Sequence, residues 1–293
     1  MPVREVESKQ NARLKELRKA LATSGRGAGG YVGIEGPILL EEALKAGLRV
    51  ATIFVAHDAE RLLAALRVPP EVEILRLPKK LLASALATEA PQPIAALVEP
   101  PQWTWAHLLH AHHSAPLIVI LAGLQDPGNL GAILRSAEAF GASGVVALPG
   151  TVSSWNPKAV RASAGSVFRV PLLAASEKEC FTNLREAGVK VLAAAARATQ
   201  PANLTDLAVP AALVIGNEGN GVPQDLAAKA DAEISIPCPG PVESLNAAVA
   251  AGVLLYEASR QRSDSVPCPS RRSARRENEW ARTQRQSPPA RKA

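Results

Sequence analysis

Residues 117–129 read Leu-Ile-Val-Ile-Leu-Ala-Gly-Leu-Gln-Asp-Pro-Gly-Asn, a continuous apolar run that ends in a cluster of turn-forming residues. An apolar run without polar alternation is typical of a strand buried on both faces, as in a parallel sheet covered by helices. The pattern after Asn129 is helical, so Asn129 is the expected N-cap and Gly141 the residue that ends the helix. This stretch predicts an α/β fold built on a parallel sheet.

The same alternation of apolar strands and helices continues to residue 262 and indicates one large domain over residues 115–262. Ser244 is expected to cap the final helix, and Leu245 to begin its apolar face. The expected strands are residues 117–121, 145–148, 170–173, 189–195, 212–215 and 233–236.

Residues 1–100 carry a separate alternation, which predicts a small α/β domain. Residues 101–114 are expected to be a linker. From residue 263 Ser, Pro and Arg dominate without periodicity, so residues 263–293 are expected to form a disordered tail. The expected elements of the first domain are helices at 10–22, 37–46, 58–66 and 79–86 and strands at 31–34, 50–56, 72–77 and 94–98.

The chain has 293 residues and a formal net charge of +6, which is unevenly distributed. Residues 263–293 hold eight Lys or Arg residues and three acidic ones. Basic character therefore belongs to the tail and to local patches, a distribution that is consistent with a polyanionic partner.

Three cysteines form no CxxC pair, which is typical of free thiols in a reducing compartment. The N-terminus has no apolar signal region, and no apolar run approaches the roughly 18 residues of a membrane span. We therefore expect a soluble, cytoplasmic protein with no membrane partner. His107, His110, His112 and His113 lie close together, but no Cys or carboxylate lies beside them, so a polar linker is favoured over a metal site.

Two further glycine-rich blocks follow predicted strands, at residues 214–221 and 236–246. Ligands of open α/β sheets bind where strands run out into loops. Arg135 lies on a mostly apolar helical segment and needs a partner or a ligand, and Glu218 could hold it in a bidentate pair. Neither block has the G-x-G-x-x-G pattern of a dinucleotide site at the start of a helix.

In order and spacing, the blocks at residues 123–141, 214–221 and 236–246 resemble the signature blocks of the SpoU-type branch of the SPOUT RNA methyltransferases. The resemblance implies a C-terminal trefoil knot, an otherwise rare feature, that holds the cofactor S-adenosyl-L-methionine. It implies that Gly216, Ile236 and Leu245 line the cofactor pocket, so that a side chain at Gly216 would occupy the space of the cofactor. The catalytic and RNA-facing positions that it implies are Asn129, Arg135, Glu218, Ser244 and Asn246.

The resemblance covers roughly residues 115–262. It departs at Cys238, where the family usually has Met, and at Ala247-Ala248, where the family often has Val-Ser. Residues 1–100 are similar, more loosely, to the ribosomal-protein-like substrate-binding domain that precedes the catalytic domain in many of these enzymes. The short matches are Ser8-Lys9-Gln10-Asn11 and Glu35-Gly36-Pro37.

Three basic residues are candidate RNA contacts. Arg13 and Lys15 lie on the helix expected at 10–22, whose basic face is either simply solvated or turned to RNA. Arg161 is either a surface helix charge or a contact to an RNA phosphate.

The function that the resemblance implies is methylation of a ribose 2′-hydroxyl in RNA, most readily ribosomal RNA, by a homodimer formed through the knotted domain. Transfer RNA is the alternative substrate, and a catalytically silent RNA-binding or ribosome-assembly factor is the alternative of another class. A guanidinium is a poor proton acceptor, so we expect Arg135 to stabilise the developing alkoxide and to clamp a phosphate, helped by Asn129.

Overall fold

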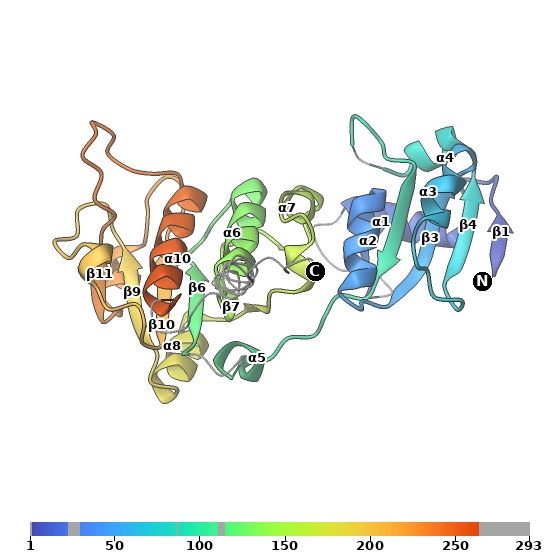
Figure 1. The fold of residues 1–293 in the computed structure, drawn as a ribbon. Coiled ribbons are helices and arrows are strands. Elements are labelled where there is room, and N and C mark those ends of the chain that lie inside the picture. Colours follow the sequence, from blue (N-terminus) through green and yellow to red (C-terminus); the bar gives the residue numbers. More distant parts are fainter. Residues whose placement is uncertain (1, 23–29, 87, 111–114, 264–293) are drawn as a thin grey trace, which may run out of the picture.

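The computed structural model describes residues 2–22, 30–86, 88–110 and 115–263. They form two β-sheets that lie side by side, each with its own helices (Figure 1). The second sheet carries the three glycine-rich blocks, and the first sheet belongs to the N-terminal part of the chain. The tail that is expected to be disordered, residues 263–293, lies outside the described residues except for Ser263, which ends the final helix.

The C-terminal sheet has six strands in the order β11-β9-β10-β6-β7-β8, and every pairing is parallel. The predicted mixed α/β fold with a parallel sheet is therefore confirmed. Parallel pairing places the carboxyl ends of all six strands at one edge of the sheet. The strands are β6 (Leu117–Leu121), β7 (Gly144–Ala147), β8 (Leu172–Ala174), β9 (Lys190–Ala194), β10 (Ala211–Ile215) and β11 (Ala232–Ile234).

Side chains of strand β6 alternate between two hydrophobic cores. Leu117, Val119 and Leu121 belong to one core, whereas Ile118 and Ile120 belong to the other. All five are fully buried, as expected for a strand covered on both faces. The helices around this sheet are α5 (Trp105–Leu109), α6 (Pro127–Ala139), α7 (Pro157–Ala162), α8 (Glu177–Glu186), α9 (Gln224–Ala227) and α10 (Ala247–Ser263), with short 3₁₀ turns η2 (Ser166–Phe168) and η3 (Ala202–Leu204).

Helix α10 runs from the carboxyl edge of the sheet to its amino edge and packs against α6 and β10. At its far end, the Arg262 guanidinium donates to the carbonyl oxygens of residues that precede β6 and β10. Nη1 lies 2.6 Å from Ala115 O, and Nη2 lies 2.7 Å from Val209 O. Burial lowers the pKa of Arg262 from its usual value, although nearby Asp206 raises it.

The N-terminal sheet has five strands in the order β1-β4-β3-β5-β2 and is mixed. Strand β5 pairs antiparallel with both β2 and β3, whereas β4 pairs parallel with β3 and β1. The strands are β1 (Val3–Glu5), β2 (Val32–Glu35), β3 (Val50–Ala56), β4 (Glu73–Leu77) and β5 (Ile94–Val98), and the helices are α1 (Ala12–Ala22), α2 (Pro37–Lys45), η1 (His57–Ala59), α3 (Glu60–Ala64) and α4 (Lys79–Ala83).

Two elements are absent from the sequence prediction. The three residues of strand β1 are exposed, so the sequence has no hydrophobic pattern there. The strand is held by its pairing with β4. Helix α5 lies inside the segment 101–114 that is expected to be a linker. Its first turn is held by the Thr104 N–H, which donates to His107 Nδ1 at 3.0 Å, and its Leu108 is fully buried in a core of the C-terminal sheet.

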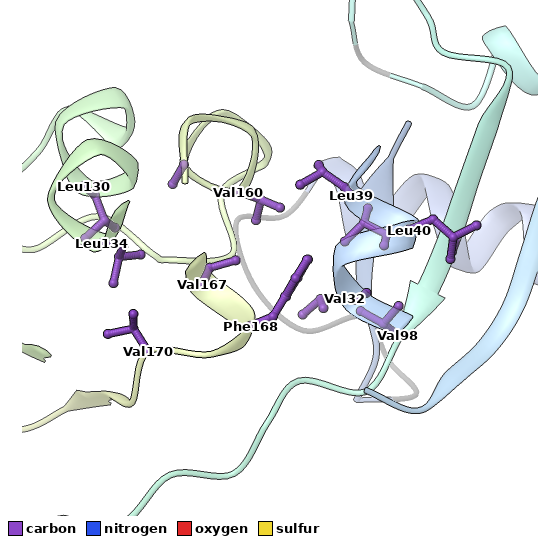
Figure 2. Close-up of a cluster of buried hydrophobic side chains, with 14 of the residues drawn as sticks. Val32, Leu39, Leu40, Val98, Leu130, Leu134, Val160, Val167, Phe168 and Val170 are labelled. Carbon is purple, nitrogen blue, oxygen red and sulfur yellow. The ribbon is translucent and has the colours of Figure 1, made fainter. Parts of the chain in front are cut away.

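The two sheets contact each other through α2 of the first and the α7–η2 segment of the second. Figure 2 shows the Phe168 side chain reaching across the junction toward α2, beside Val32, with Val160 and Leu39 on either side of the junction. A polar clamp lies beside this contact. Arg169 donates to Glu42 Oε2 at 2.7 Å and holds the Glu138 carboxylate through Nε and Nη2.

Candidate active site

Helix α6 begins earlier than expected, and its cap is a different residue. The Asp126 carboxylate accepts from the Asn129 N–H at 2.9 Å, and Pro127 occupies the first turn, where a missing N–H costs nothing. The prediction that Asn129 caps this helix is therefore wrong. Since Asp126 does the capping, the Asn129 side chain is available for other contacts. Gly141, with φ 72°, ends the helix as predicted.

Glu218 lies in a tight loop after β10. Asn217 Oδ1 accepts from the N–H groups of Gly219 and Asn220 at 3.0 and 2.7 Å, which closes the loop. Gly216 lies where the loop crosses itself: a Cβ there would lie 1.9 Å from the carbonyl carbon of Gly221. Glycine is needed at this position for the chain's own backbone, so Gly216→Val is expected to distort the loop before it reaches any cofactor.

The carboxylate of Glu218 is directed at the first turn of α6. It accepts from the backbone N–H groups of Gln125 and Asp126 at 3.3 and 3.1 Å and from Asn129 Nδ2 at 2.9 Å. Its partners are therefore amide N–H groups. The predicted bidentate pair between Glu218 and Arg135 is wrong.

Asn246 brings the third block to the same place. Its Nδ2 donates to Asn129 Oδ1 at 3.1 Å, and its Oδ1 accepts from the N–H groups of Ala248 and Val249 at 2.9 and 3.3 Å. Asn246 is thus the N-cap of α10, and the prediction that Ser244 caps this helix is wrong. Ser244 is exposed, two residues ahead of the cap.

Side-chain hydrogen bonds therefore join all three blocks in the chain Glu218–Asn129–Asn246. The Asn129 amide uses its nitrogen toward Glu218 and its oxygen toward Asn246, so both of its polar atoms are occupied. These contacts span 89 and 117 residues of sequence. The network lies at the carboxyl ends of β6 and β10, where open parallel sheets bind ligands.

Glu218 is held as a carboxylate. Partial burial raises its pKa, but hydrogen bonds from Asn129 and from backbone N–H groups outweigh burial, and the net effect is a pKa below its usual value. The pKa of Asp126 is lowered as well, chiefly by the Asn129 N–H. Two carboxylates with lowered pKa values give this edge of the sheet a fixed negative charge beside exposed cations.

One such cation is Lys158, at the start of α7, whose Nζ lies 3.4 Å from Asp126 Oδ2. Sequence reasoning missed both Asp126 and Lys158 as parts of the site. The Asp-Pro pair could have revealed the first, because Asp at the N-cap and Pro in the first turn is a recognisable helix start. Only the fold brings Lys158 to this place.

Arg135 lies on α6 and is exposed, in contrast to the buried Leu130, Ile133 and Leu134 of the same helix. It forms no ion pair with any described residue. Its guanidinium is therefore free to meet a ligand from solution, which keeps the predicted electrostatic role open.

The third block forms a Pro-rich loop between β11 and α10. Its apolar ends, Ile236 and Leu245, are half-buried, and the residues between them are exposed. Residues 236–245 make no backbone hydrogen bond with any other described residue. Uncommitted backbone groups between two apolar side chains fit a ligand that has an aromatic base and polar edges.

None of the three predicted RNA contacts is hydrogen-bonded to this network in the described part of the chain. Arg13 is paired with Glu16 at 2.9 Å and with Glu73 at 3.4 Å, and the hydrogen bond that it donates to Glu16 raises its pKa. Lys15 and Arg161 are exposed.

Within the part of the chain that the structure describes, no three His, Cys, Asp or Glu residues gather as they would around a metal ion. His112 and His113 lie outside the described residues. No described helix is both long and apolar enough to cross a membrane.

Comparison with known proteins identifies both halves of the chain. Residues 116–256 match the SpoU rRNA Methylase family, and residues 11–96 match the MRM3-like substrate binding domain. The chain is 33% identical to the 23S rRNA (guanosine(2553)-2′-O)-methyltransferase of Bacillus subtilis, over 87% of this chain and 98% of that protein.

Solved structures agree over the same span. The AdoMet-bound rRNA methyltransferase from Sinorhizobium meliloti superposes with a TM-score of 0.76 at 32% identity, over 88% of this chain and 98% of that one. The SpoU methyltransferase AviRb from Streptomyces viridochromogenes, in complex with the cofactor AdoMet, gives a TM-score of 0.74 at 29% identity, over 86% and 98%. These similarities confirm the predicted resemblance and the predicted RNA methyltransferase activity. The chain belongs to the SpoU rRNA methylase family.

Proposed function

We propose that this protein transfers a methyl group from S-adenosylmethionine to a ribose 2′-hydroxyl of ribosomal RNA. The observation that carries the proposal is the hydrogen-bonded chain Glu218–Asn129–Asn246, which joins the three family blocks at the carboxyl edge of the parallel sheet. The similarity to a 23S rRNA 2′-O-methyltransferase supports ribosomal RNA over transfer RNA.

In this reaction the 2′-oxygen forms a bond to the methyl carbon, the carbon–sulfur bond breaks, and the hydroxyl proton is lost. S-adenosylmethionine supplies the electrophilic methyl group when it is bound. The protein orients the hydroxyl and stabilises the negative charge that develops on its oxygen. Arg135 supplies the positive charge, since a guanidinium is a permanent cation and this one is not paired with a described residue. The Glu218–Asn129 contact holds the start of α6 in place.

The cofactor pocket is proposed to lie between the Glu218 loop and the Pro-rich loop, with Ile236 and Leu245 as its apolar walls and Gly216 at its back. The loop 236–245 offers uncommitted backbone groups to the adenine and the ribose. After edge strand β11 the chain returns to the centre of the sheet, where α10 contacts β10 and α6. We propose that this return is threaded as a trefoil knot.

We propose that two copies pair through α10. Val249, Val253 and Tyr256 are 52, 40 and 55% exposed and lie at i, i+4 and i+7, so they form one apolar stripe on this helix. An exposed stripe of this kind marks an interaction surface. Sedimentation analysis of the protein should give a dimer, and Val253→Glu should give a monomer.

We also propose a role for each of the two domains and a cellular compartment for the protein. Residues 1–100 are proposed to select the RNA, and residues 115–262 are proposed to catalyse methyl transfer. Lys15 and Arg161 are proposed to contact RNA phosphates. Ser244, which is exposed beside the network, is proposed to face the RNA. The free thiols of Cys180 and Cys238 fit a reducing cytoplasm.

Mapping ribose methylation in total RNA from cells with and without the gene tests the function. One ribosomal position should lose its 2′-O-methyl group in the deletion strain and regain it with the wild-type gene. A methylation pattern unchanged by the deletion would overturn the proposal. Calorimetric titration with S-adenosylmethionine separates the enzyme from a catalytically silent RNA-binding factor, which would show no heat of binding.

A further inference from the structure

Three of the four tryptophans of this chain gather at one place, although aromatic residues are only 3% of the sequence. Trp103 and Trp155 line a groove of about 700 Å³ beside the segment that joins the two sheets. Trp105 lies on α5 and donates its indole N–H to Glu179 Oε1 at 3.0 Å. Trp280 lies outside the described residues.

The groove adjoins the candidate active site. Its wall is the loop that follows β7, and this loop is bonded to the segment before α6: Thr151 Oγ1 donates to Leu121 O at 3.0 Å, and Val152 N–H donates to Leu124 O at 2.8 Å. The same loop leads into α7, where Lys158 contacts Asp126 of the network. Gly216, Ile236 and Leu245 are not among its lining residues, so the groove is distinct from the proposed cofactor pocket.

The lining favours a flat, uncharged ligand. Trp155 stacks on Phe168 with ring centroids 6.3 Å apart and an interplanar angle of 22°, which fixes its ring. Trp103 is half-buried and meets His107 edge-on at 5.3 Å. The groove is also lined by residues with hydroxyl groups, which can take part in hydrogen bonds to a ligand, namely Thr151, Ser153, Ser154 and Ser176.

The groove carries a negative charge, whereas the neighbouring helix α7 carries positive charges. The charged residue that lines it is Glu179, whose carboxylate would repel a phosphate. Two exposed cations, Lys158 and Arg161, lie on α7 just after Trp155. A nucleotide whose base enters the groove and whose backbone passes along α7 satisfies both observations. Unpaired RNA bases are recognised in this way, by stacking on aromatic rings and by hydrogen bonds to their edges.

We propose that the groove between Trp103 and Trp155 binds one unpaired base of the RNA substrate, next to the nucleotide that is methylated. The proposal rests on the proposed function for the identity of the ligand. Because Trp103 belongs to the segment between the two sheets, the base is held where the substrate-binding half meets the catalytic half.

Equilibrium binding tests the groove without methyl transfer. The probes are a single-stranded RNA dodecamer of mixed sequence and the same ribose–phosphate chain without bases, both measured with the full-length protein. Trp103→Ala should weaken binding of the dodecamer by about 5- to 150-fold, the range for loss of one base–aromatic stack. Its affinity for the base-free chain should stay at the wild-type value, because that chain has no base to stack.

Two further variants separate stacking from structure. Trp103→Phe keeps a ring and should recover most of the affinity, and Trp105→Phe, which only removes the bond to Glu179, should bind like the wild type. Wild-type affinity of Trp103→Ala for the dodecamer, or equal weakening for both probes, would overturn the proposal. Unchanged dodecamer binding by Trp103→Ala, together with loss of one rRNA methylation in the deletion strain, would overturn the groove proposal alone. Normal base-dependent binding without any methylation would count against the proposed function alone.

Discussion

The two sheets use charged and polar side chains in different ways. In the N-terminal sheet the ion pairs lie at the surface: Arg49–Glu99 and Lys79–Asp58 have cations that are 71 and 69% exposed. In the C-terminal sheet the chain Glu218–Asn129–Asn246 gathers at one edge from three separate blocks. All-parallel pairing is the reason, because it sends every loop after a strand to the same edge, whereas mixed pairing distributes the loops. Chemistry is therefore expected in the second sheet and recognition in the first.

The largest expected effect is at the carboxyl edge of the second sheet. Arg135→Ala should lower the rate of methyl transfer by about 100- to 1,000-fold, the usual cost of losing one group that stabilises developing charge. Affinity for S-adenosylmethionine should stay near the wild-type value by calorimetry. Arg135→Lys should recover little, because a point charge does not replace a planar fork. Arg185→Ala, on α8, is the matched control and should be active. Substantial activity of Arg135→Ala would remove this residue from the site.

The next largest effect is expected at helix α5, which tests whether the C-terminal domain begins before residue 111. Leu108→Ala should lower the free energy of unfolding by about 2–3 kcal/mol, because Leu108 is fully buried in the C-terminal core while the short α5 can partly relax. A fragment that starts at residue 111 lacks this side chain and should be less stable than one that starts at residue 100. Both should bind S-adenosylmethionine and lose the native RNA target. Equal melting temperatures of the two fragments would place α5 outside the core.

The junction between the sheets should respond to Arg169. Arg169→Met leaves Glu138 without its ion pair and Glu42 with Lys45 as its remaining cation at a partly buried contact, and should cost about 1–2 kcal/mol. RNA methylation should fall while cofactor affinity stays unchanged, since the clamp joins α2 to α6. The control is Arg49→Met, which breaks an exposed pair and should cost less than about 1 kcal/mol.

This clamp also predicts a pH dependence. Hydrogen bonding from Arg169 lowers the pKa of Glu138 below its ordinary value of 4.5. The carboxylate therefore contributes stability above that value, and the contribution is lost as pH falls through the lower folded-state pKa. The stability gap between the wild type and Arg169→Met should narrow on acidification below about pH 4.5. If the difference in unfolding free energy between the two proteins is constant with pH, the Arg169–Glu138 ion pair is not its cause.

Asn246 has a capping role and a linking role that two substitutions can separate. Asn246→Ala removes the cap of α10 and should cost about 1 kcal/mol of stability. Asn246→Asp keeps the capping oxygen and should retain near-wild-type stability, but it loses the Nδ2 donor to Asn129. If the network matters for methyl transfer, both variants lose activity. Wild-type activity of Asn246→Asp would restrict this residue to capping.

The smallest effect is expected from the tail. Deletion of residues 264–293 removes eight basic and three acidic residues and should weaken RNA binding at low salt. The dependence of log Kd on log salt concentration should become shallower, and the modified nucleotide should stay the same. A change of the methylated position would assign target selection to the tail.

The parallel sheet could be predicted from the sequence because its central strands are long apolar runs such as Leu117–Leu121. Helix starts were harder to place. Asn129 and Ser244 are good capping residues, but Asp126 and Asn246 do the capping, because several capping residues lie close together in each loop. Strand β1 and helix α5 depend on contacts with distant residues, so local pattern does not reveal them.

The candidate site was predictable as a set of residues but not as a set of contacts. The family resemblance brought Asn129, Glu218 and Asn246 together, yet Glu218 binds amide N–H groups and not Arg135. Which of two polar partners a carboxylate meets depends on the path of the loop. The Gly216–Gly221 crossing sets that path, and no spacing rule encodes it.

Helix α10 connects the two edges of the sheet over a fixed length. One end is tied to the reaction edge by Asn246, and the other is tied to the opposite edge by Arg262. Its 17 residues measure about 25 Å, and each added or removed residue would shift one end by about 1.5 Å and turn it by about 100°. Such a change would break either the contact of Asn246 or the contacts of Arg262. The residue count of this helix therefore has to match the width of the sheet.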